Sequence, residues 1–551
     1  MMKEVSVIFL VLALLSPSYG ADETVSFPAA MMTVPELTNY QRTSTFAEVV
    51  AVVDALRQSS DLIHRETLLL TEDGKDVPLL VLARPPIATP AQARASGKPV
   101  IYIQGNIHGG EVEGKEASLI IMRDILFGDK QHLLDDQILV FVPIYNADGN
   151  DNMSSDARPS QELSPLMAGE RQAHGYDLNR DGMAVETAET RALYLNVIQR
   201  WDPALLVDLH TTNGTWHGYS LTYAPSYHTA GDGATSAYTA DVMLPAIAQS
   251  VKEKFNLDFG WYGGFDYRDW PPKELRTYHH APRYLTNNMG LRNRMAILAE
   301  TFAHDRFYKR VHAANVFVEE ILEYTNTHGR EMQRINAQAD VRTASRLQQQ
   351  TGAIENGIQF EMAPLEEPLG LLSYKYIPYT TPTGDTEFAR SSEIVTIAGV
   401  LNYNRFEATK RATVPTAYVF PAELSQVAET LTEHGIDVAV LEQDTRFEGE
   451  VFSVTGIETQ AFVQNQHRNT LLQGQYRSAS QQFSAGDYYV ALDNRLANLI
   501  FYLLEAQSDD GLAYWNFFDS YLQSALAQNP GDAAVVDFPV FKVLSIAAPP
   551  N

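Results

Sequence analysis

The chain has 551 residues, of which 45% are hydrophobic and 20% are charged, so it is a globular protein too long for a single hydrophobic core. Its formal net charge of −27 argues against nucleic acid or an anionic membrane as a partner, because binding to phosphate groups needs a basic surface. The absence of cysteine excludes disulfides and thiol catalysis, so any zinc must be held by histidine and carboxylate side chains.

The first twenty residues have the features of a secretory signal peptide. Lys3 precedes an apolar run from Val5 to Leu15, and the small residues Ser18 and Gly20 suit a cleavage site. The run is too short to span a membrane permanently, and no later stretch reaches 18 uninterrupted apolar residues. We therefore expect a soluble exported protein, periplasmic or extracellular, with no stable membrane insertion.

Strands and helices are predicted to alternate from residue 36 to residue 330. Apolar runs typical of strands cover 66–70, 77–83, 100–103, 138–142, 204–207 and 295–298. Helical patterns cover 45–58, 113–126 and 186–200. This alternation predicts an α/β fold with a mixed, mainly parallel sheet and helices on both faces. Ligands of such sheets bind beyond the carboxyl ends of the strands.

A polar helical segment at 331–354 is predicted to link this domain to a smaller C-terminal domain at 355–545. A β-α-β pattern covers 416–441, further strands are expected at 451–454 and 488–492, and a closing helix is expected at 494–505. This predicts a second α/β or mixed domain. Its histidines, His434 and His467, lack the spacing of metal ligands, so we expect a structural or substrate-shaping role there.

Side chains that can bind zinc follow two of the apolar runs. His108 and Glu111 lie three residues apart in a turn after 100–103, and His210 follows 204–207. Two histidines and a glutamate form a ligand set of catalytic zinc. The His-x-x-Glu pair alone is common by chance, and a histidine at a sheet edge is the alternative for His210. The position of all three side chains after apolar strands favours one zinc per chain. Gly109 and Gly110 are expected to free the backbone so that His108 and Glu111 point inward.

Other carboxylates have different predicted roles. Glu300 ends the run at 295–298, where a carboxylate would enter a buried layer at a cost, and a general base beside the metal explains this position. Glu113 and Glu116 begin the helix at 113–126 and are interpreted as solvated carboxylates favoured by the helix dipole. Asn146 and Asp148 follow the run at 138–142 and are further candidates at a strand end.

A polar loop between residues 171 and 181 contains groups that suit carbonyl and carboxylate oxygens. Arg180 with Asn179 suits the free carboxylate of a substrate, because a guanidinium pairs with a carboxylate bidentately. The alternative is a salt bridge from Arg180 to Asp177 or Asp181. Arg171 is placed just upstream, where it could polarise a scissile carbonyl.

Across about residues 36–330 these motifs resemble the zinc carboxypeptidases of the carboxypeptidase A type. The motifs that occur in the family's order are His108-Gly-Gly-Glu111, Asn179-Arg180, His210 and Glu300. Asn146-Ala-Asp-Gly149 is similar to the family's Asn-Pro-Asp-Gly turn. The last 200 residues resemble those appended to a bacterial, exported subset of the family.

The resemblance also implies roles for single residues. It implies that Arg171 stabilises the oxyanion, with Arg158 as the alternative because the family's Trp-Arg pair reads Glu-Arg at 170–171. It implies that Asp177 fixes the ring of a zinc histidine. The family's mobile tyrosine precedes the catalytic glutamate, and Tyr284 is preferred to Tyr278 because its segment leads directly into the strand that ends at the glutamate.

The expected function is that of a zinc metallocarboxypeptidase that removes C-terminal residues from peptides. The resemblance implies that Asn179 and Arg180 clamp the terminal carboxylate, and the sequence places Glu300 as the base. The alternative is a zinc amidohydrolase acting on acyl-amino acids or peptidoglycan-type peptides, which would not need Arg180 to hold a terminal carboxylate. A catalytically silent binding protein is disfavoured because the three ligands and the base are all present.

Overall fold

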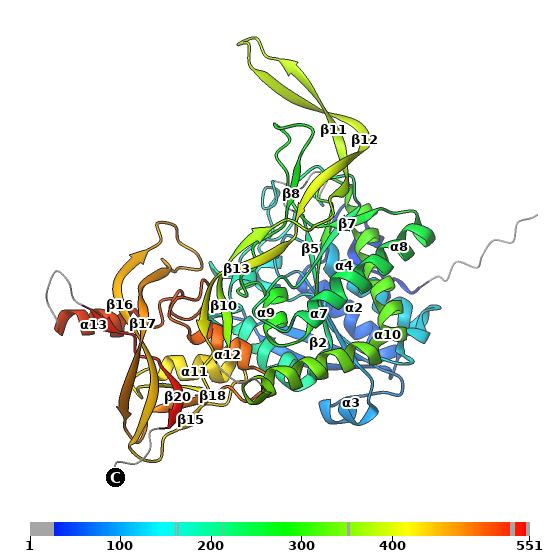
Figure 1. Cartoon of the computed structure of the whole chain (residues 1–551). Coiled ribbons are helices and arrows are strands. Elements are labelled where there is room, and N and C mark those ends of the chain that lie inside the picture. Colours follow the sequence, from blue (N-terminus) through cyan, green and yellow to red (C-terminus); the bar gives the residue numbers. More distant parts are fainter. Residues whose placement is uncertain are drawn as a thin grey trace, which may run out of the picture.

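The computed structural model describes residues 27–159, 161, 165–212, 214–349, 353–528 and 535–546 (Figure 1). The predicted signal peptide lies outside the described residues. Within these ranges no helix combines the length and the apolar character needed to cross a membrane.

An eight-stranded sheet forms the centre of the N-terminal half. In spatial order its strands are β1 (Ile63–Leu70), β2 (Asp76–Leu82), β4 (Ile138–Val142), β3 (Val100–Gly105), β5 (Leu205–Thr211), β9 (Met295–Thr301), β6 (Leu221–Pro225) and β7 (Phe259–Trp261). The four central strands β4, β3, β5 and β9 run parallel, whereas β1, β2 and β6 join the sheet through antiparallel pairs. The predicted mixed, mainly parallel sheet is confirmed.

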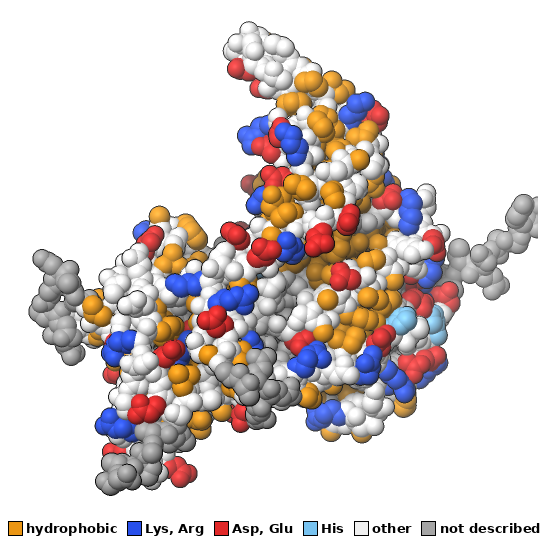
Figure 2. All heavy atoms as spheres, in the orientation of Figure 1, with side chains coloured by type: hydrophobic (Ala, Val, Ile, Leu, Met, Phe, Trp, Pro, Cys, Tyr) orange, Lys and Arg blue, Asp and Glu red, His pale blue; other side chains and the backbone are white. Residues whose placement is uncertain are grey.

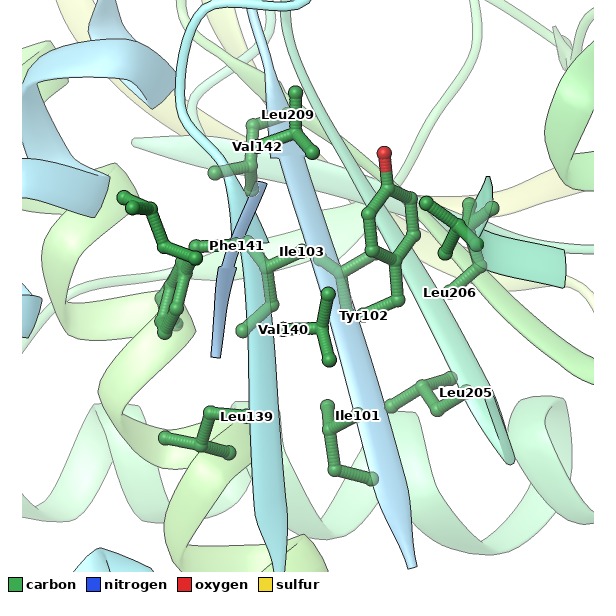
Figure 3. Close-up of a cluster of buried hydrophobic side chains, with 14 of the residues drawn as sticks. Ile101, Tyr102, Ile103, Leu139, Val140, Phe141, Val142, Leu205, Leu206 and Leu209 are labelled. Atoms are coloured by element: carbon green, nitrogen blue, oxygen red, sulfur yellow. The ribbon is translucent and has the colours of Figure 1, made fainter. Parts of the chain in front are cut away.

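The central strands are apolar because they are buried on both faces of the sheet. Every residue of β3, β4, β5 and β9 is buried, as expected when helices cover both sides. Figure 3 shows Ile101, Tyr102 and Ile103 of β3 beside Val140 and Phe141 of β4, all with no exposed surface. Each such side chain contributes roughly 1.5–3 kcal/mol of burial free energy.

Helices α4 and α10 pack against each other, α4 also contacts β3 and β5, and α10 contacts β9. The helices of this half are α1 (Val34–Leu37), α2 (Phe46–Ser59), α3 (Pro90–Ser96), α4 (Glu113–Phe127), α5 (Ala147–Asp151), α6 (Ala188–Ala192), α7 (Gly233–Tyr238), α8 (Leu244–Phe255), α9 (Leu285–Leu291) and α10 (Phe307–Gln349). The helix predicted at 186–200 is α6 followed by a π-helical segment at Leu193–Gln199. The polar segment predicted at 331–354 is largely the second half of α10, which begins in the N-terminal half.

A second sheet, in which all the paired strands run antiparallel, forms the C-terminal half. Its strands are β15 (Ala439–Val440), β18 (Tyr488–Ala491), β14 (Ala417–Phe420), β20 (Phe541–Ile546), β16 (Thr445–Thr459) and β17 (Thr470–Phe483), and β19 (Val536–Asp537) also pairs with β16. Its helices are α11 (Ser425–Glu433), α12 (Ala497–Leu504) and α13 (Asp519–Gln528). The predicted β-α-β unit is β14-α11-β15, but β18 lies between its two strands and pairs antiparallel with both.

Two further strand pairs connect the halves of the molecule. β10 (Glu355–Ala363) pairs with β13 (Arg405–Thr413), and β11 (Leu369–Thr380) with β12 (Thr386–Tyr403) forms a long hairpin that projects beyond β8 (Figure 1). β12 also pairs with β8 (Glu274–Arg276) of the N-terminal half. Residues of both halves share one hydrophobic cluster, in which Met183 and Leu291 pack among C-terminal side chains.

Figure 2 shows one face of the molecule, on which basic and acidic side chains are interspersed and no continuous basic area gathers. Hydrophobic side chains are visible along the β11–β12 hairpin, where Ile377, Tyr379 and Ile394 are exposed.

Candidate metal centre and active site

The turn after β3 holds His108 and Glu111 through close backbone packing. Asn106 adopts a left-handed conformation (φ 67°), and its Nδ2 donates to the carbonyl oxygens of His108, Gly109 and Glu111 at 3.0–3.3 Å. Neither Gly109 nor Gly110 has a positive φ. A Cβ on either residue would lie 2.4 Å from a neighbouring backbone atom. Glycine is therefore needed at these positions for the close approach of the backbone and not for a positive φ.

Three side chains converge as a candidate metal centre at the carboxyl ends of β3 and β5. His108 Nδ1 lies 3.0 Å from Glu111 Oε1, and His210 Nδ1 lies 2.8 Å from Glu111 Oε2. All three residues are buried, and their ligand atoms lie within 4.8 Å of one another. The three ligands predicted from the sequence are thus brought together.

The outer nitrogen of each histidine faces a carboxylate. His108 Nε2 is 3.1 Å from Asp177 Oδ1, and His210 Nε2 is 2.8 Å from Asp208 Oδ2. A carboxylate accepts the Nε2 proton and leaves a lone pair on Nδ1 for a metal. Asp208 was not assigned this role from the sequence, although residues two apart on a strand share a face and so place it on the side of His210.

The donor set therefore fits zinc. Two imidazoles with a fixed tautomer and one carboxylate make the His₂Glu set, and the site needs no thiolate, which this chain lacks. Burial raises the pKa of the Asp177 carboxyl, but His108, Arg180 and Arg171 outweigh it and hold that pKa well below its usual range. Asp177 is therefore charged and can keep the ring of His108 oriented.

Glu300 lies beside the metal centre on the next strand. In the parallel pairing of β5 with β9, Glu300 is the register partner of His210. Its Oε2 is buried and has no hydrogen-bond partner among the described residues. Burial, together with the charge of Glu111, raises the pKa of Glu300 to about 8 despite nearby cationic groups. A carboxyl group with a pKa near neutrality can both accept and return a proton.

A cavity of about 500 Å³ opens over these residues. The metal ligands, Glu300, Asn179 and three arginines (Arg158, Arg171 and Arg180) all line it. Arg158 Nη2 donates to Glu111 Oε1 at 2.8 Å, and Arg171 Nε donates to Asp177 Oδ2 at 2.9 Å. Both candidates for the oxyanion-stabilising arginine therefore reach the same cavity, each held by a different carboxylate.

Arg180 and Asn179 occupy a structured part of the cavity wall. Arg180 Nη1 donates to the Asn179 carbonyl at 2.7 Å, and its guanidinium lies 4.2 Å from the centre of the Tyr284 ring. Asn179 Oδ1 accepts from the amide of Leu285. A salt bridge to Asp177 was the alternative to a substrate-binding role for Arg180. This contact is long, with Arg180 Nη1 3.9 Å from Asp177 Oδ2.

Three tyrosines line the same cavity. Tyr284 and Tyr278 pack edge to face with ring centres 5.2 Å apart, and the Tyr278 hydroxyl lies 3.0 Å from Thr286 Oγ1. The motifs of the sequence did not identify Tyr262 as a residue of the site. It directly follows β7, a three-residue strand that is too short to give a periodic signal. Burial and the charges of Glu300 and Glu111 raise the pKa of Tyr262 well above its usual value, so its hydroxyl stays protonated.

The interpretation of Glu113 and Glu116 as solvated carboxylates is wrong, because both are fully buried. Glu113 accepts from Arg310 Nε of α10 at 2.7 Å and from Thr211 Oγ1 of β5 at 2.5 Å. Glu116 accepts from the side chains of Thr43 and Ser44. The first turn of α4 therefore joins the strand of His210 to α10 through a buried polar network.

Asn146 and Asp148 do not line the cavity. Asn146 Nδ2 donates to the carbonyl of Ile107 and to that of Arg171, so it supports the two segments that carry His108 and Arg171. Asp148 accepts from Lys75 Nζ at 2.8 Å and pairs with His174 at 3.0 Å. Both residues follow β4 as predicted. Asn146 supports the backbone around the site, whereas Asp148 lies outside the cavity.

The fold and this centre define the class of the protein as a mainly parallel α/β protein with a candidate His₂Glu zinc site. Residues 49–262 match the model of the zinc carboxypeptidase family. The matched segment includes all three candidate metal ligands and ends before Glu300.

The carboxypeptidases to which the chain is similar are distant in sequence. Carboxypeptidase 2 of Trichophyton rubrum is 23% identical over 157 residues, which make up 28% of this chain and only 26% of the fungal protein. A metallo-carboxypeptidase from Burkholderia cenocepacia aligns with a TM-score of 0.37 and 16% identity over 51% of this chain and 69% of its own. The carboxypeptidase A from Helicoverpa armigera aligns with a TM-score of 0.38 and 15% identity over 54% and 74%.

Proposed function

We propose that this protein is an exported zinc-dependent carboxypeptidase that releases C-terminal residues from peptides. The observation that supports this most strongly is the composition of one cavity. Groups that suit a free carboxylate, Arg180 and Asn179, line the same cavity as the metal ligands and Glu300. The apolar run and small residues before position 21 support export.

Each group in the cavity has a task in this reaction. Zinc held by the His₂Glu set supplies a Lewis acid for hydrolysis. Glu300, which lines the cavity beside the metal ligands, takes a proton from the attacking water and later gives it to the leaving amine. Arg171 offers positive charge to the oxygen of the scissile carbonyl. We prefer Arg171 to Arg158 for this task because Arg158 is bonded to the metal ligand Glu111.

Asn179 and Arg180 would bind the terminal carboxylate. The guanidinium of Arg180 is mostly buried, with 19% of the side chain exposed, and its contacts with Tyr284 and the Asn179 carbonyl restrict its motion. A restricted guanidinium loses little entropy when it binds a carboxylate bidentately. An endopeptidase has no such need, so this part of the cavity favours an exopeptidase.

The test compares peptides with free and amidated C-termini. Amidation removes the partner of Arg180, and an unpaired charge in a buried site costs roughly 3–5 kcal/mol. We therefore expect kcat/KM to be at least about a hundredfold lower for the amidated peptide. Arg180→Ala should strongly reduce hydrolysis of the free peptide and barely change that of the amidated one. Arg57→Ala, on the exposed side of α2, is the matched control and should change neither rate.

The alternative function, a zinc amidohydrolase that recognises only the acyl side, predicts a different result. Such an enzyme would hydrolyse free and amidated substrates at equal rates. Equal rates of the zinc-loaded protein on free and amidated peptides would reject the carboxypeptidase proposal. The assignment of the metal ligands would be unaffected. Cell fractionation of the producing organism tests export, which a wholly cytosolic protein would contradict.

A further inference from the structure

The loop between β16 and β17 in the C-terminal half contains a tight turn that reaches the N-terminal half. Gln464 and His467 exchange backbone hydrogen bonds of 2.9 Å in both directions. The two residues between them, Asn465 and Gln466, have φ values of 44° and 68°. Positive φ at both central positions is the geometry of a two-residue hairpin turn of type I′.

The side chain of Asn465 binds the backbone of Asp177 at both polar groups. Asn465 Oδ1 accepts from the Asp177 amide at 3.0 Å, and Asn465 Nδ2 donates to the Asp177 carbonyl at 3.0 Å. Asn465 is 9% exposed, so water competes little for these bonds. One residue of the C-terminal half therefore fixes the peptide groups on both sides of the Asp177 α-carbon.

Asp177 is the residue through which this contact reaches the metal centre. Its Oδ1 faces Nε2 of the zinc-site residue His108, and its Oδ2 accepts from Arg171. The chain before Asp177 makes a second tight turn, in which Ala173 and Tyr176 exchange backbone bonds. Its tip, Gly175, faces Gln466, so the two turns lie against each other.

Neighbouring bonds hold the same loop without touching Asp177. His467 Nε2 lies 2.8 Å from Glu186 Oε2, and Arg283 Nη1 donates to Gln464 Oε1 at 2.5 Å. We expect these contacts to keep the turn docked when the side chain at 465 is changed. The effect of Asn465 can therefore be separated from docking of the whole C-terminal half.

We propose that Asn465 is a positioning residue for the metal centre, acting through Asp177. By fixing the Asp177 backbone it sets the direction of the carboxylate, which in turn orients His108 and Arg171. The C-terminal half is then a working part of the active site. The expected effect of Asn465 on zinc binding depends only on the zinc site. The expected effect of Asn465 on turnover rests on the proposed function.

The test uses a matched pair of variants of the full-length, zinc-loaded protein. Asn465→Gly removes both bonds to Asp177, and glycine accepts a positive φ without strain. Gln466→Gly removes a side chain from the same turn at a position that is also left-handed. Removing a contact that orients a metal ligand costs about 10–100-fold in metal affinity, and Asn465 acts one contact further away. We expect zinc to dissociate roughly three- to tenfold faster from Asn465→Gly and at the wild-type rate from Gln466→Gly.

Zinc release into excess chelator, followed with a colorimetric indicator, gives the rate without any substrate. The thermal midpoint of the metal-free protein should be similar for both variants, whereas the gain on adding zinc should be smaller for Asn465→Gly. In an Asp177→Ala background, Asn465→Gly should cause no further acceleration, because the two changes act on one connection. If the proposed function holds, kcat should fall more than KM changes.

Several results would overturn the inference. Equal zinc dissociation from Asn465→Gly and Gln466→Gly would do so, as would a full additional effect in the Asp177→Ala background. A metal-free midpoint that falls by as much as the zinc-loaded one would show a purely structural role. Failure of the proposed function looks different, since a protein that binds zinc and responds to Asn465→Gly yet hydrolyses no peptide would leave this inference intact.

Discussion

Glu300 shows how one residue acquires its chemistry from the sheet around it. It stands opposite His210 on the adjacent strand, and its buried Oε2 lacks a partner in the described part of the chain. Its pKa of about 8 follows mainly from burial. A carboxylate at this depth is costly to the fold. Its position is explained if the group exchanges protons with a substrate or water.

We predict that Glu300→Gln keeps zinc and loses nearly all turnover. Glutamine has the same shape but cannot take up a proton, so general-base catalysis is removed, and kcat should fall by about a hundredfold or more. Zinc content, measured by elemental analysis, should stay near one equivalent. His210→Ala is the contrasting variant and should lose the metal. Near-normal turnover in Glu300→Gln would assign the base to another residue.

At the level of elements, the sequence predicts what is local and regular. The strands that lead to His108, His210 and Glu300 are continuous apolar runs, so their existence and their mainly parallel arrangement could be inferred. Burial of the first turn of α4 could not be inferred, because Glu113 and Glu116 are charged. Their partners, such as Arg310 and Thr43, lie far away in the chain. The bonds of Asp177 to Asn465 span 288 residues and leave no local pattern.

The packing of α4 on the sheet gives a second prediction. A Cβ on Gly114 would lie 2.4 Å from Cβ of Leu209, the residue before the metal ligand His210. Gly114→Ala should therefore destabilise the fold by about 1–3 kcal/mol, although alanine favours a helix. Gly233→Ala is the control, since its new methyl group meets no atom within 4 Å.

Chemical denaturation of both glycine variants measures this difference, and zinc content shows whether the displaced strand still presents His210. Only Gly114→Ala should shift the denaturation midpoint to lower denaturant. Equal midpoints for the two variants would mean that α4 can move away from β5 at no cost, against the close packing described here.

For the molecule as a whole, the important surface is the seam between its two halves. His434, at the end of α11, is fully buried there. Its Nε2 donates to the carbonyl of Met183 at 3.0 Å, and its Nδ1 accepts from Arg292 at 2.8 Å. The bond from Arg292 requires an unprotonated Nδ1 and therefore a neutral imidazole. Since Asn465 also crosses this seam, conditions that open it should disturb the active site as well.

The last prediction is that His434 makes the fold sensitive to acid. Burial and the charge of Arg292 lower the pKa of His434 from 6.5 to about 3. Above pH 6.5 the histidine is neutral in both the folded and the unfolded chain, and its contribution to stability is complete. Between pH 6.5 and 3 only the unfolded chain takes up the proton, so the free energy of unfolding falls as the pH falls, by up to about 1.4 kcal/mol per pH unit.

His434→Gln cannot take up this proton, so it should be less stable than the wild type at pH 7 and should lose less stability on acidification. Denaturation of the metal-free proteins at pH 7, 6, 5 and 4 measures the difference, because the other histidines are common to both. His132→Gln, with 48% of the histidine side chain exposed, is the control and should follow the wild type. Parallel pH profiles for wild type and His434→Gln would show that the seam tolerates a charged imidazole.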